Sequence, residues 1–244
     1  MRVMILTDNE FIYNEFKFIV QKGQYEDITF EYFFSKTNEE FKVKYKDSEF
    51  KKIDLKDDLD LIIRRYKLIL SLHCKQIFPN RLVSSIRCIN IHPGFNPYNR
   101  GWFPQVFSIL NKLPIGVTIH EMDNKLDHGP IILQREVKIS SYDTSYDVYK
   151  KIQNLEIELL TNNLRDIIDR NYKSILPKSE GNINFKKNFD DLCEIDLDKV
   201  VRFRDAIDYL RALSFHGYEN AYFYDEDGRK VSVEINLKVM EDKI

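Results

Sequence analysis

The chain has 244 residues, of which 43% are hydrophobic and 31% charged, so it can bury a core as one large or two small globular domains. Its 37 basic and 39 acidic side chains leave a formal net charge of −2, which offers no general attraction for nucleic acid or an anionic membrane. No apolar run approaches the roughly 20 residues of a membrane-spanning helix, and the opening MRVMILTDNEF turns acidic too early for a secretory signal, so we expect a cytoplasmic protein that binds neither nucleic acid nor membrane.

The three cysteines are not arranged for a metal site or a disulfide framework. Cys74, Cys88 and Cys193 are an odd number, have no CxxC spacing, and include two that lie within apolar, strand-like runs. We therefore expect free thiols, mostly buried.

The first two thirds of the chain alternate between strand-like and helix-like patterns. Short apolar, β-branched runs predict strands at residues 2–7, 27–34, 66–73, 85–92, 116–123 and 131–139, and helical spacing predicts helices at 9–20 and 104–111. The charged stretch 42–60 reads as a loop or surface helix. This order is typical of an α/β fold with a mostly parallel sheet, which binds ligands at the carboxyl ends of its strands.

A long amphipathic helix is expected from Thr144 to about Asn171, with Asp143 or Thr144 capping its start and Asp147 three residues after the latter. The composition then changes: a polar connection is followed by a helical pattern over 196–213 and a hairpin over 221–235 around Asp227–Gly228. We expect two domains, 1–175 carrying the catalytic site and 176–244 forming a small carboxyl-terminal α+β unit.

Unusual residues crowd one quarter of the chain. Six of the seven prolines, four of the eight glycines, four of the five histidines and the single tryptophan fall between His73 and Pro130. Proline and glycine fix special turns, and histidine titrates near neutral pH, so this crowding indicates a shaped polar site on loops between strands.

Within CINIHPG, the alternation of a strand places Asn90 and His92 on one face and two isoleucines on the other. An amide can donate to an oxyanion that forms on a carbonyl, and an imidazole can accept the proton that an attacking amine loses. A nearby carboxylate can orient the histidine and favour its protonated form. Spacing alone leaves Glu121, Asp123 and Asp127 open for that role.

Other readings of the same region are weaker. His73, His120 and His128, taken singly, are more typical of hydrogen-bonded core histidines. A metal site built from histidines and Asp127 lacks HExxH, paired cysteines or an Asp-rich loop, and neither GxGxxG nor a P-loop motif occurs, so we expect no metal and no dinucleotide.

Residues 90–132, NIHPGFNPYNRGWFPQVFSILNKLPIGVTIHEMDNKLDHGPII, closely resemble the formyltransferases that use 10-formyltetrahydrofolate. The resemblance rests on an Asn-x-His at a strand end, an Arg-Gly loop, a helix, a Gly-Val-Thr strand and a Leu-Asp-x-Gly loop in that order. It implies a Rossmann-like amino-terminal domain that carries the folate, with Asn90, His92 and Asp127 as the catalytic residues.

Within that superfamily the loop NPYNRGWFPQVFSI looks most like the sugar N-formyltransferases of surface-polysaccharide (O-antigen, lipopolysaccharide) synthesis, which act on dTDP-linked amino-dideoxyhexoses. The glycinamide ribonucleotide enzymes carry a Gly-Ser-Asn loop where this chain has residues 7–10, Thr-Asp-Asn-Glu, which argues against that substrate. Relatives are commonly dimers, and segments such as AYFY could form the homodimer contact.

The resemblance also implies ligand contacts. The pterin would lie near Lys75, Gln76, Ile77, Asp123 and Lys125. The amino sugar and its diphosphate would meet Asn9, Pro93, Gly94, Tyr98, Asn99 and Arg100, with Trp102 or Tyr222 stacked on thymine; alternatively, Trp102 and Phe103 simply pack the loop down.

Several alternatives stay open. The amino group could be at carbon 4, as in dTDP-4-amino-4,6-dideoxy-D-glucose, which we favour, or at carbon 3. The chain could instead be a methionyl-tRNA formyltransferase, although the acidic groups after Pro177 counter a basic tRNA-binding surface. It could also be a formyl-folate hydrolase or a ligand-binding protein without turnover.

Overall fold

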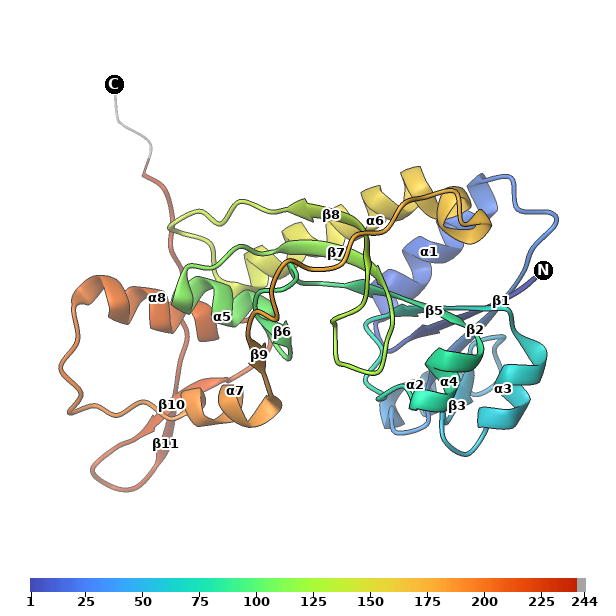
Figure 1. Cartoon of the computed structure of the whole chain (residues 1–244). Helices are drawn as coiled ribbons and strands as arrows, with labels where there is room; N and C mark the ends of the chain where they lie inside the picture. Colours follow the sequence, from blue (N-terminus) through green and yellow to red (C-terminus); the bar gives the residue numbers. More distant parts are fainter. Residues whose placement is uncertain (241–244) are drawn as a thin grey trace.

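The computed structural model describes residues 1–240, and its centre is one mixed β-sheet (Figure 1). Within these residues, seven strands follow the order β3 (Lys51–Ile53), β2 (Thr29–Ser35), β1 (Arg2–Thr7), β4 (Leu68–Leu72), β5 (Arg87–His92), β7 (Gly116–Glu121) and β8 (Ile131–Glu136). The first five are parallel to their neighbours, whereas β7 pairs antiparallel with both β5 and β8. The predicted mostly parallel, Rossmann-like sheet is confirmed.

Helices cover both faces of the sheet (Figure 1). The long helices α1 (Glu10–Lys22) and α6 (Ser145–Asp169) lie together on one face, with α5 (Pro104–Asn111) beside them. The other face is covered by α3 (Leu59–Arg65) and α4 (Asn80–Ser85). The short helix α2 (Glu39–Lys44) lies near α1: Phe41 joins the core cluster of that face, and Lys44 bonds Glu10. The charged stretch 42–60 thus contains the end of α2, the edge strand β3 and the start of α3.

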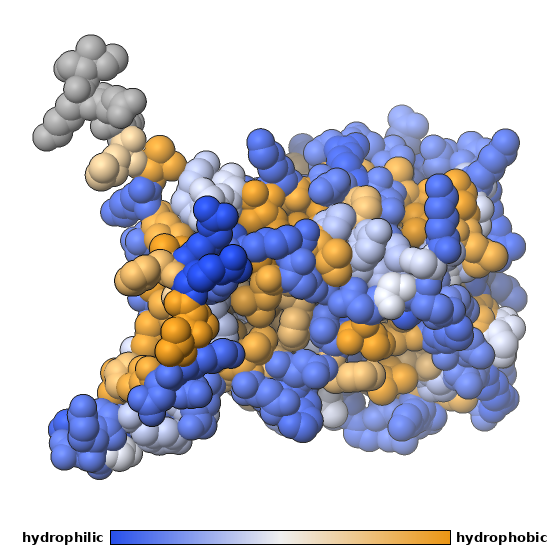
Figure 2. Space-filling view, turned by 60° about the vertical axis from the view of Figure 1, so that its left-hand side comes forward, coloured by the Kyte–Doolittle hydropathy of each residue, from blue (hydrophilic) through white to orange (hydrophobic). Residues whose placement is uncertain are grey.

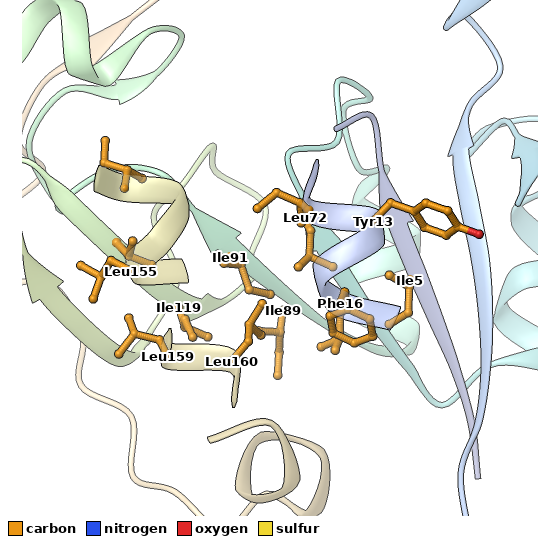
Figure 3. Packing of buried hydrophobic residues seen from close by; sticks show 14 of the residues in the cluster. Ile5, Tyr13, Phe16, Leu72, Ile89, Ile91, Ile119, Leu155, Leu159 and Leu160 are labelled. Carbon is orange, nitrogen blue, oxygen red and sulfur yellow. The ribbon is translucent and has the colours of Figure 1, made fainter. Parts of the chain in front are cut away.

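Strand alternation divides the core into two clusters. Ile89 and Ile91 point toward α6, where Leu159 and Leu160 pack on them (Figure 3), while Cys88 joins the cluster on the opposite face. All five residues of β4 are buried, as expected for a central parallel strand. Asn90 and His92 share the face of Cys88, so the predicted separation of polar and apolar residues along β5 is present.

The predicted cap of the long helix is confirmed. Thr144 accepts from the backbone of Asp147, and the Asp147 carboxylate accepts from the backbone of Thr144, which forms a capping box. The helix ends at Asp169, two residues before the predicted end, where Arg170 turns left-handed (φ 61°).

The carboxyl-terminal part contains β9 (Ile183–Asn184), α7 (Lys186–Cys193), α8 (Phe203–Leu213) and the antiparallel hairpin of β10 (Ala221–Tyr224) and β11 (Lys230–Val233). The predicted hairpin is confirmed, but the helix expected from residue 196 begins only at Phe203. The side chain of Asp196 accepts from the backbone N–H of Asp198, and this local turn competes with helix formation. The sequence reading also missed α7 and α4.

The strap, residues 180–184 of the carboxyl-terminal part, lies against the loop that follows β5. The two-residue strand β6 (Arg100–Gly101) pairs in parallel with β9. Gly181 (φ 63°) passes so close that an added Cβ would lie 1.8 Å from the Pro97 carbonyl oxygen. This contact fixes loop 97–102, which forms one wall of the candidate site described next.

Candidate active site

Three parallel strands bring their polar ends to one edge of the sheet. The registers pair Thr7 with Leu72 and Leu72 with Ile91, so the following residues, Asp8, His73 and His92, lie side by side. The Asp8 carboxylate accepts from the backbone of Ser35 and Lys75, both at 2.9 Å, and so joins the ends of β2 and β4 to β1. The carboxyl-terminal edge is therefore a polar surface, as the strand pattern predicted.

Asn90, His92 and Asp127 lie together beside this edge. Asn90 Nδ2 donates to Asp127 Oδ1 at 2.9 Å, and His92 Nδ1 lies 3.6 Å from Asp127 Oδ2. Asp127 belongs to the loop between β7 and β8, which hangs below the sheet in Figure 1. The 3.6 Å separation is too long for a hydrogen bond.

The other two carboxylates left open by the sequence have different partners. Asp123 Oδ2 is 2.7 Å from His128 Nδ1, and Glu121 accepts from the Tyr172 hydroxyl at 2.6 Å. Asp127 is therefore the carboxylate that faces His92.

The loop after β5 clamps Asp127 in a left-handed conformation (φ 46°). The backbone of Gly101 donates to Asp127 Oδ2 at 3.1 Å, and Asn96 Nδ2 donates to the Asp127 carbonyl at 2.8 Å. Arg100 Nη1 donates to the neighbouring Leu126 carbonyl at 3.0 Å. Asn96 was not predicted as a site residue, because its contact with residue 127 depends on how two distant loops meet.

Burial keeps His92 neutral. Removal from water lowers the pKa of His92 to about 4, and the attraction of Asp127 only partly offsets that effect. Asp127 does favour the protonated histidine, as expected, but the effect of burial on the pKa of His92 is larger. Near pH 7, His92 is a free base.

His92 Nε2 is one of four buried side-chain polar atoms without a hydrogen-bond partner in residues 1–240; the others are Arg87 Nη1, Asn96 Oδ1 and Arg100 Nε. Asn96 and Arg100, which carry two of these atoms, are the residues that hold the Asp127 loop. Gly94 lies directly beside Nε2, since an added Cβ would approach it to 2.2 Å. Unsatisfied polar atoms gathered in one place are typical of a site that awaits a ligand.

His120 is a buried, hydrogen-bonded histidine, as predicted, but one of its contacts is a residue of the site. It pairs across the strands with Asn90, and its Nδ1 lies 2.9 Å from the Glu121 carbonyl. Nδ1 therefore carries the proton, and the free electron pair of Nε2 faces Asn90 Nδ2 at 3.4 Å. The cross-strand register was the missing information.

The residues predicted near the pterin lie at the strand edge and on the adjacent loop. Ile77 is 80% exposed, whereas the Gln76 side chain is bonded to the backbone of Leu55 and Ile53. Only the backbone of Gln76 thus remains for a ligand. Lys125 Nζ lies 3.0 Å from Glu180 of the strap.

The residues predicted to bind the sugar nucleotide separate into different environments. Asn99 is completely buried, and its amide bonds Ser108, Asn111 and Asn182, so it holds the loop and leaves no side-chain donor for a ligand. Arg100 is buried and uses Nη1 to hold the Asp127 loop, whereas its Nε has no hydrogen-bond partner among the described residues.

The two aromatic candidates also differ. Trp102 is 39% exposed beside Phe103, which stacks on Phe189 at 4.0 Å. Tyr222 lies on β10, far from the strand edge (Figure 1). Trp102 is thus the aromatic residue that remains near the site.

Asn9 lies elsewhere on the edge, in the wall of a cavity of about 310 Å³ between α1, α2 and α6. Its Oδ1 caps α1, and its Nδ2 donates to the Tyr149 hydroxyl at 2.9 Å. The cavity is also lined by Phe11, Tyr146, Tyr149, Lys150 and Phe215.

A Rossmann-like sheet with a neutral buried histidine, an amide and a carboxylate at its edge defines an acyl-transfer type of centre. Residues 21–164 match the family model described as formyl transferase, and residues 188–239 match the N-formyltransferase dimerization C-terminal domain. The chain belongs to the formyl transferase family and is a formyltransferase.

Relatives of this chain narrow the substrate class further. Over 185 residues, 76% of this chain and 79% of the relative, it is 49% identical to a Mycobacterium tuberculosis protein named dTDP-4-amino-4,6-dideoxyglucose formyltransferase. A 4-N formyltransferase from Francisella tularensis superposes with a TM-score of 0.93 at 49% identity, covering 98% of both chains. A sugar N-formyltransferase from Shewanella superposes with 0.92 at 40% identity, covering 99% of both.

Residues 1–240 contain no group of three or more histidine, cysteine or acidic side chains placed to hold a metal ion. In the same range, no helix is both long and apolar enough to cross a bilayer. All three cysteines are free thiols, as predicted.

Proposed function

We propose that this enzyme transfers the formyl group of 10-formyltetrahydrofolate to the 4-amino group of dTDP-4-amino-4,6-dideoxy-D-glucose, in the cytoplasm, for surface-polysaccharide synthesis. The 49% identity to a relative that carries this substrate in its name, and the structural match to a 4-N formyltransferase, support carbon 4 over carbon 3. The observation that carries the chemistry is the buried, neutral His92 with a free Nε2 beside Asn90 and Asp127.

The reaction needs one base and one oxyanion donor. The neutral amine attacks the formyl carbon, and the carbonyl oxygen becomes an oxyanion. Asn90 stabilises that charge with the N–H that now makes only the long, 3.4 Å contact with His120, while its other N–H stays on Asp127. His92 Nε2 takes the proton from the attacking nitrogen and returns one to the folate nitrogen as its bond to the formyl carbon breaks. Asp127 stabilises the imidazolium between these two transfers.

The two ligands would approach from different sides. We assign the folate to the exposed backbone around Lys75, Gln76 and Ile77 and to the Asp123–Asp127 loop with Lys125. We assign the sugar to Pro93 and Gly94 beside His92, and the nucleotide to the cavity at Asn9, whose walls include Phe11, Tyr146 and Phe215. Aromatic walls suit a nucleobase, and Trp102 stays a second candidate for stacking.

We also propose that residues 176–244 form a homodimer unit. The described part of this unit exposes large apolar side chains on one end of the molecule, and Figure 2 shows the hydrophobic colour gathered there. The most exposed are Leu176, Leu197, Val200, Phe203, Tyr218, Val239 and Met240. The match of residues 188–239 to a dimerization domain supports this assignment.

The deciding experiment is an assay of formyl transfer from 10-formyltetrahydrofolate, with product masses recorded. The acceptor would be dTDP-4-amino-4,6-dideoxyglucose, the 3-amino isomer, charged methionyl-tRNA, or no amine at all. We expect one added formyl group on the 4-amino sugar only. Product on the 3-amino sugar alone would assign the formylated amino group to carbon 3. Product on tRNA would overturn the assignment of a sugar as the acceptor. Turnover of the formyl-folate without any amine would indicate a hydrolase. Sedimentation analysis of the purified chain tests the dimer.

A further inference from the structure

A second buried histidine–carboxylate pair lies one strand away from His92 and takes no part in the chemistry above. Both carboxylate oxygens of Glu156 lie 2.8 Å from His73 Nε2, and Glu156, on α6, is completely buried. His73 adopts a left-handed backbone (φ 59°), which is uncommon for a residue other than glycine. Such strain at a strand end is found where the side chain has a specific task.

Hydrogen bonds connect this pair to the wall of the nucleotide cavity. His73 Nδ1 lies 3.0 Å from the Tyr149 hydroxyl, and Asn9 Nδ2 donates to the same hydroxyl at 2.9 Å. Tyr149 and Glu156 are seven residues apart on α6, so two helical turns bring them to one face. Tyr149 and Asn9 both line the cavity of about 310 Å³. The chain of contacts thus runs from a buried carboxylate to a surface that a ligand can reach.

The buried location decides where the protons are. Burial raises the pKa of Glu156, and the attraction of His73, to which both carboxylate oxygens are bonded, offsets this only in part, so the pair favours a state without net charge. Glu156 is then either ionised beside a doubly protonated His73, or protonated and donating to His73 Nε2. In both states Nδ1 of His73 carries a proton and donates to the Tyr149 hydroxyl oxygen. The remaining state, an ionised Glu156 beside a His73 without a proton on Nδ1, buries an uncompensated negative charge.

The Tyr149 hydroxyl therefore accepts two hydrogen bonds, one from His73 and one from Asn9. Its own proton has no partner among these groups and is free to donate into the cavity that Tyr149 lines. Burial raises the pKa of Tyr149, so the hydroxyl keeps this proton. A donor of fixed direction in this wall suits an oxygen atom of a sugar nucleotide.

We propose that Glu156 and His73 are positioning residues that fix the Tyr149 hydroxyl as a donor to an oxygen of the nucleotide-linked sugar, either on its diphosphate or on its pyranose ring. The inference rests on the proposed function, since it needs a sugar nucleotide in this cavity. Neither Glu156 nor His73 has to touch the ligand.

The experiment combines Tyr149→Phe, Glu156→Gln and the double variant in the formyl-transfer assay. Loss of one ligand hydrogen bond should raise KM for the sugar nucleotide by about 5- to 20-fold in Tyr149→Phe, with KM for the formyl donor changed less than about twofold. Glu156→Gln should raise the same constant by a smaller factor, because a neutral amide lets the His73 proton sit on either nitrogen. The double variant should match Tyr149→Phe, since the carboxylate acts only through the hydroxyl.

Matched controls use the same chemical changes away from the site. Tyr142→Phe, at an exposed tyrosine, and Glu158→Gln, on the exposed side of α6, should leave both KM values unchanged. Calorimetric measurement of dTDP binding tells whether the Tyr149 hydroxyl donates to the diphosphate or to the pyranose ring. If Tyr149→Phe binds dTDP more weakly than wild type, the acceptor is on the diphosphate. If dTDP binding is unchanged while KM for the sugar nucleotide rises, the acceptor is on the sugar ring.

The proposal is overturned if Tyr149→Phe leaves KM for the sugar nucleotide unchanged, or if the effect of Glu156→Gln adds in full to that of Tyr149→Phe. Equal increases in both KM values would also overturn it, because they indicate a general structural defect. Should Glu156→Gln fail to fold, Tyr149→Phe still decides, as it loses a single hydroxyl. A wild-type protein that forms no formylated sugar would instead overturn the proposed function.

Discussion

Two buried histidine–carboxylate pairs lie on neighbouring strands of this enzyme, and they are built differently. His73 and Glu156 are 2.8 Å apart, and both ring nitrogens of the histidine have partners. His92 and Asp127 are 3.6 Å apart without a hydrogen bond, and His92 Nε2 has no partner among the described residues. The first pair is complete without a ligand, whereas the second needs one.

This difference indicates two roles: the His73–Glu156 pair orients its neighbours, and the His92–Asp127 pair exchanges a proton. A buried polar atom left without a partner costs about 1–3 kcal/mol, so it persists where function requires it. The complete pair can only orient its neighbours. The incomplete pair can exchange a proton, because burial makes His92 a free base near pH 7.

The largest effect is expected when the incomplete pair loses its base. His92→Gln should lower kcat by about 100- to 10,000-fold, because the amide cannot take the proton from the attacking amine. Its thermal midpoint should stay close to that of the wild type, because the glutamine amide is similar in size and, like the neutral imidazole, uncharged. Turnover at saturating substrates and thermal unfolding would be measured together. A variant that keeps more than about a tenth of wild-type kcat would assign the base to another residue.

A slightly smaller loss is expected at the oxyanion donor. Asn90→Ala should lower kcat by about 100- to 1,000-fold while the protein still folds. The matched control is Asn163→Ala on α6, whose amide bonds only the Leu159 carbonyl at 2.7 Å and should keep full activity. Wild-type turnover in Asn90→Ala would remove this residue from the mechanism.

Breaking the His73–Glu156 pair should lower the stability of the folded protein rather than kcat. Glu156→Ala leaves His73 unpaired in a buried place and should lower the free energy of unfolding by about 3–5 kcal/mol. Glu158→Ala, which breaks an exposed ion pair with Arg135 on the same helix, should cost at most about 1 kcal/mol. Urea unfolding of the two variants measures the difference. Equal losses would mean that the buried pair contributes no more than a surface one.

The sequence predicted the incomplete pair much better than the complete one. The alternation along β5 placed Asn90 and His92 on one face, and the loop before Gly129 supplied Asp127, although spacing could not choose it over Glu121 or Asp123. These residues lie within a short stretch of chain, where local pattern carries information. The effect of Asp127 on His92 has the predicted sign, but the larger, opposite effect of burial was not predicted, because the degree of burial is a property of the whole fold.

The pairing of His73 with Glu156 was not predicted from the sequence, for a physical reason. Glu156 lies 83 residues after His73, and its position within the helical pattern of α6 looked like one more polar residue. Only the packing of α6 on the sheet brings the carboxylate to the end of β4. Likewise, Asn99 looked like a ligand contact but is buried among other asparagines, because the strap covers it.

The smallest effect is a pH dependence that separates the two pairs once more. The unfolded chain protonates His92 near its ordinary pKa of 6.5, whereas the folded protein does so only at about 4. Between these values the unfolded state binds more protons, so the contribution of His92 to stability is complete above pH 6.5 and is lost as the pH falls toward 4. The loss amounts to about 3 kcal/mol over this window. Other groups titrate in the same range, so the useful quantity is the difference in urea unfolding free energy between wild type and His92→Gln at each pH. That difference should shift by this amount in favour of the variant between pH 6.5 and 4, and a difference that stays constant would show that His92 is not held neutral by burial.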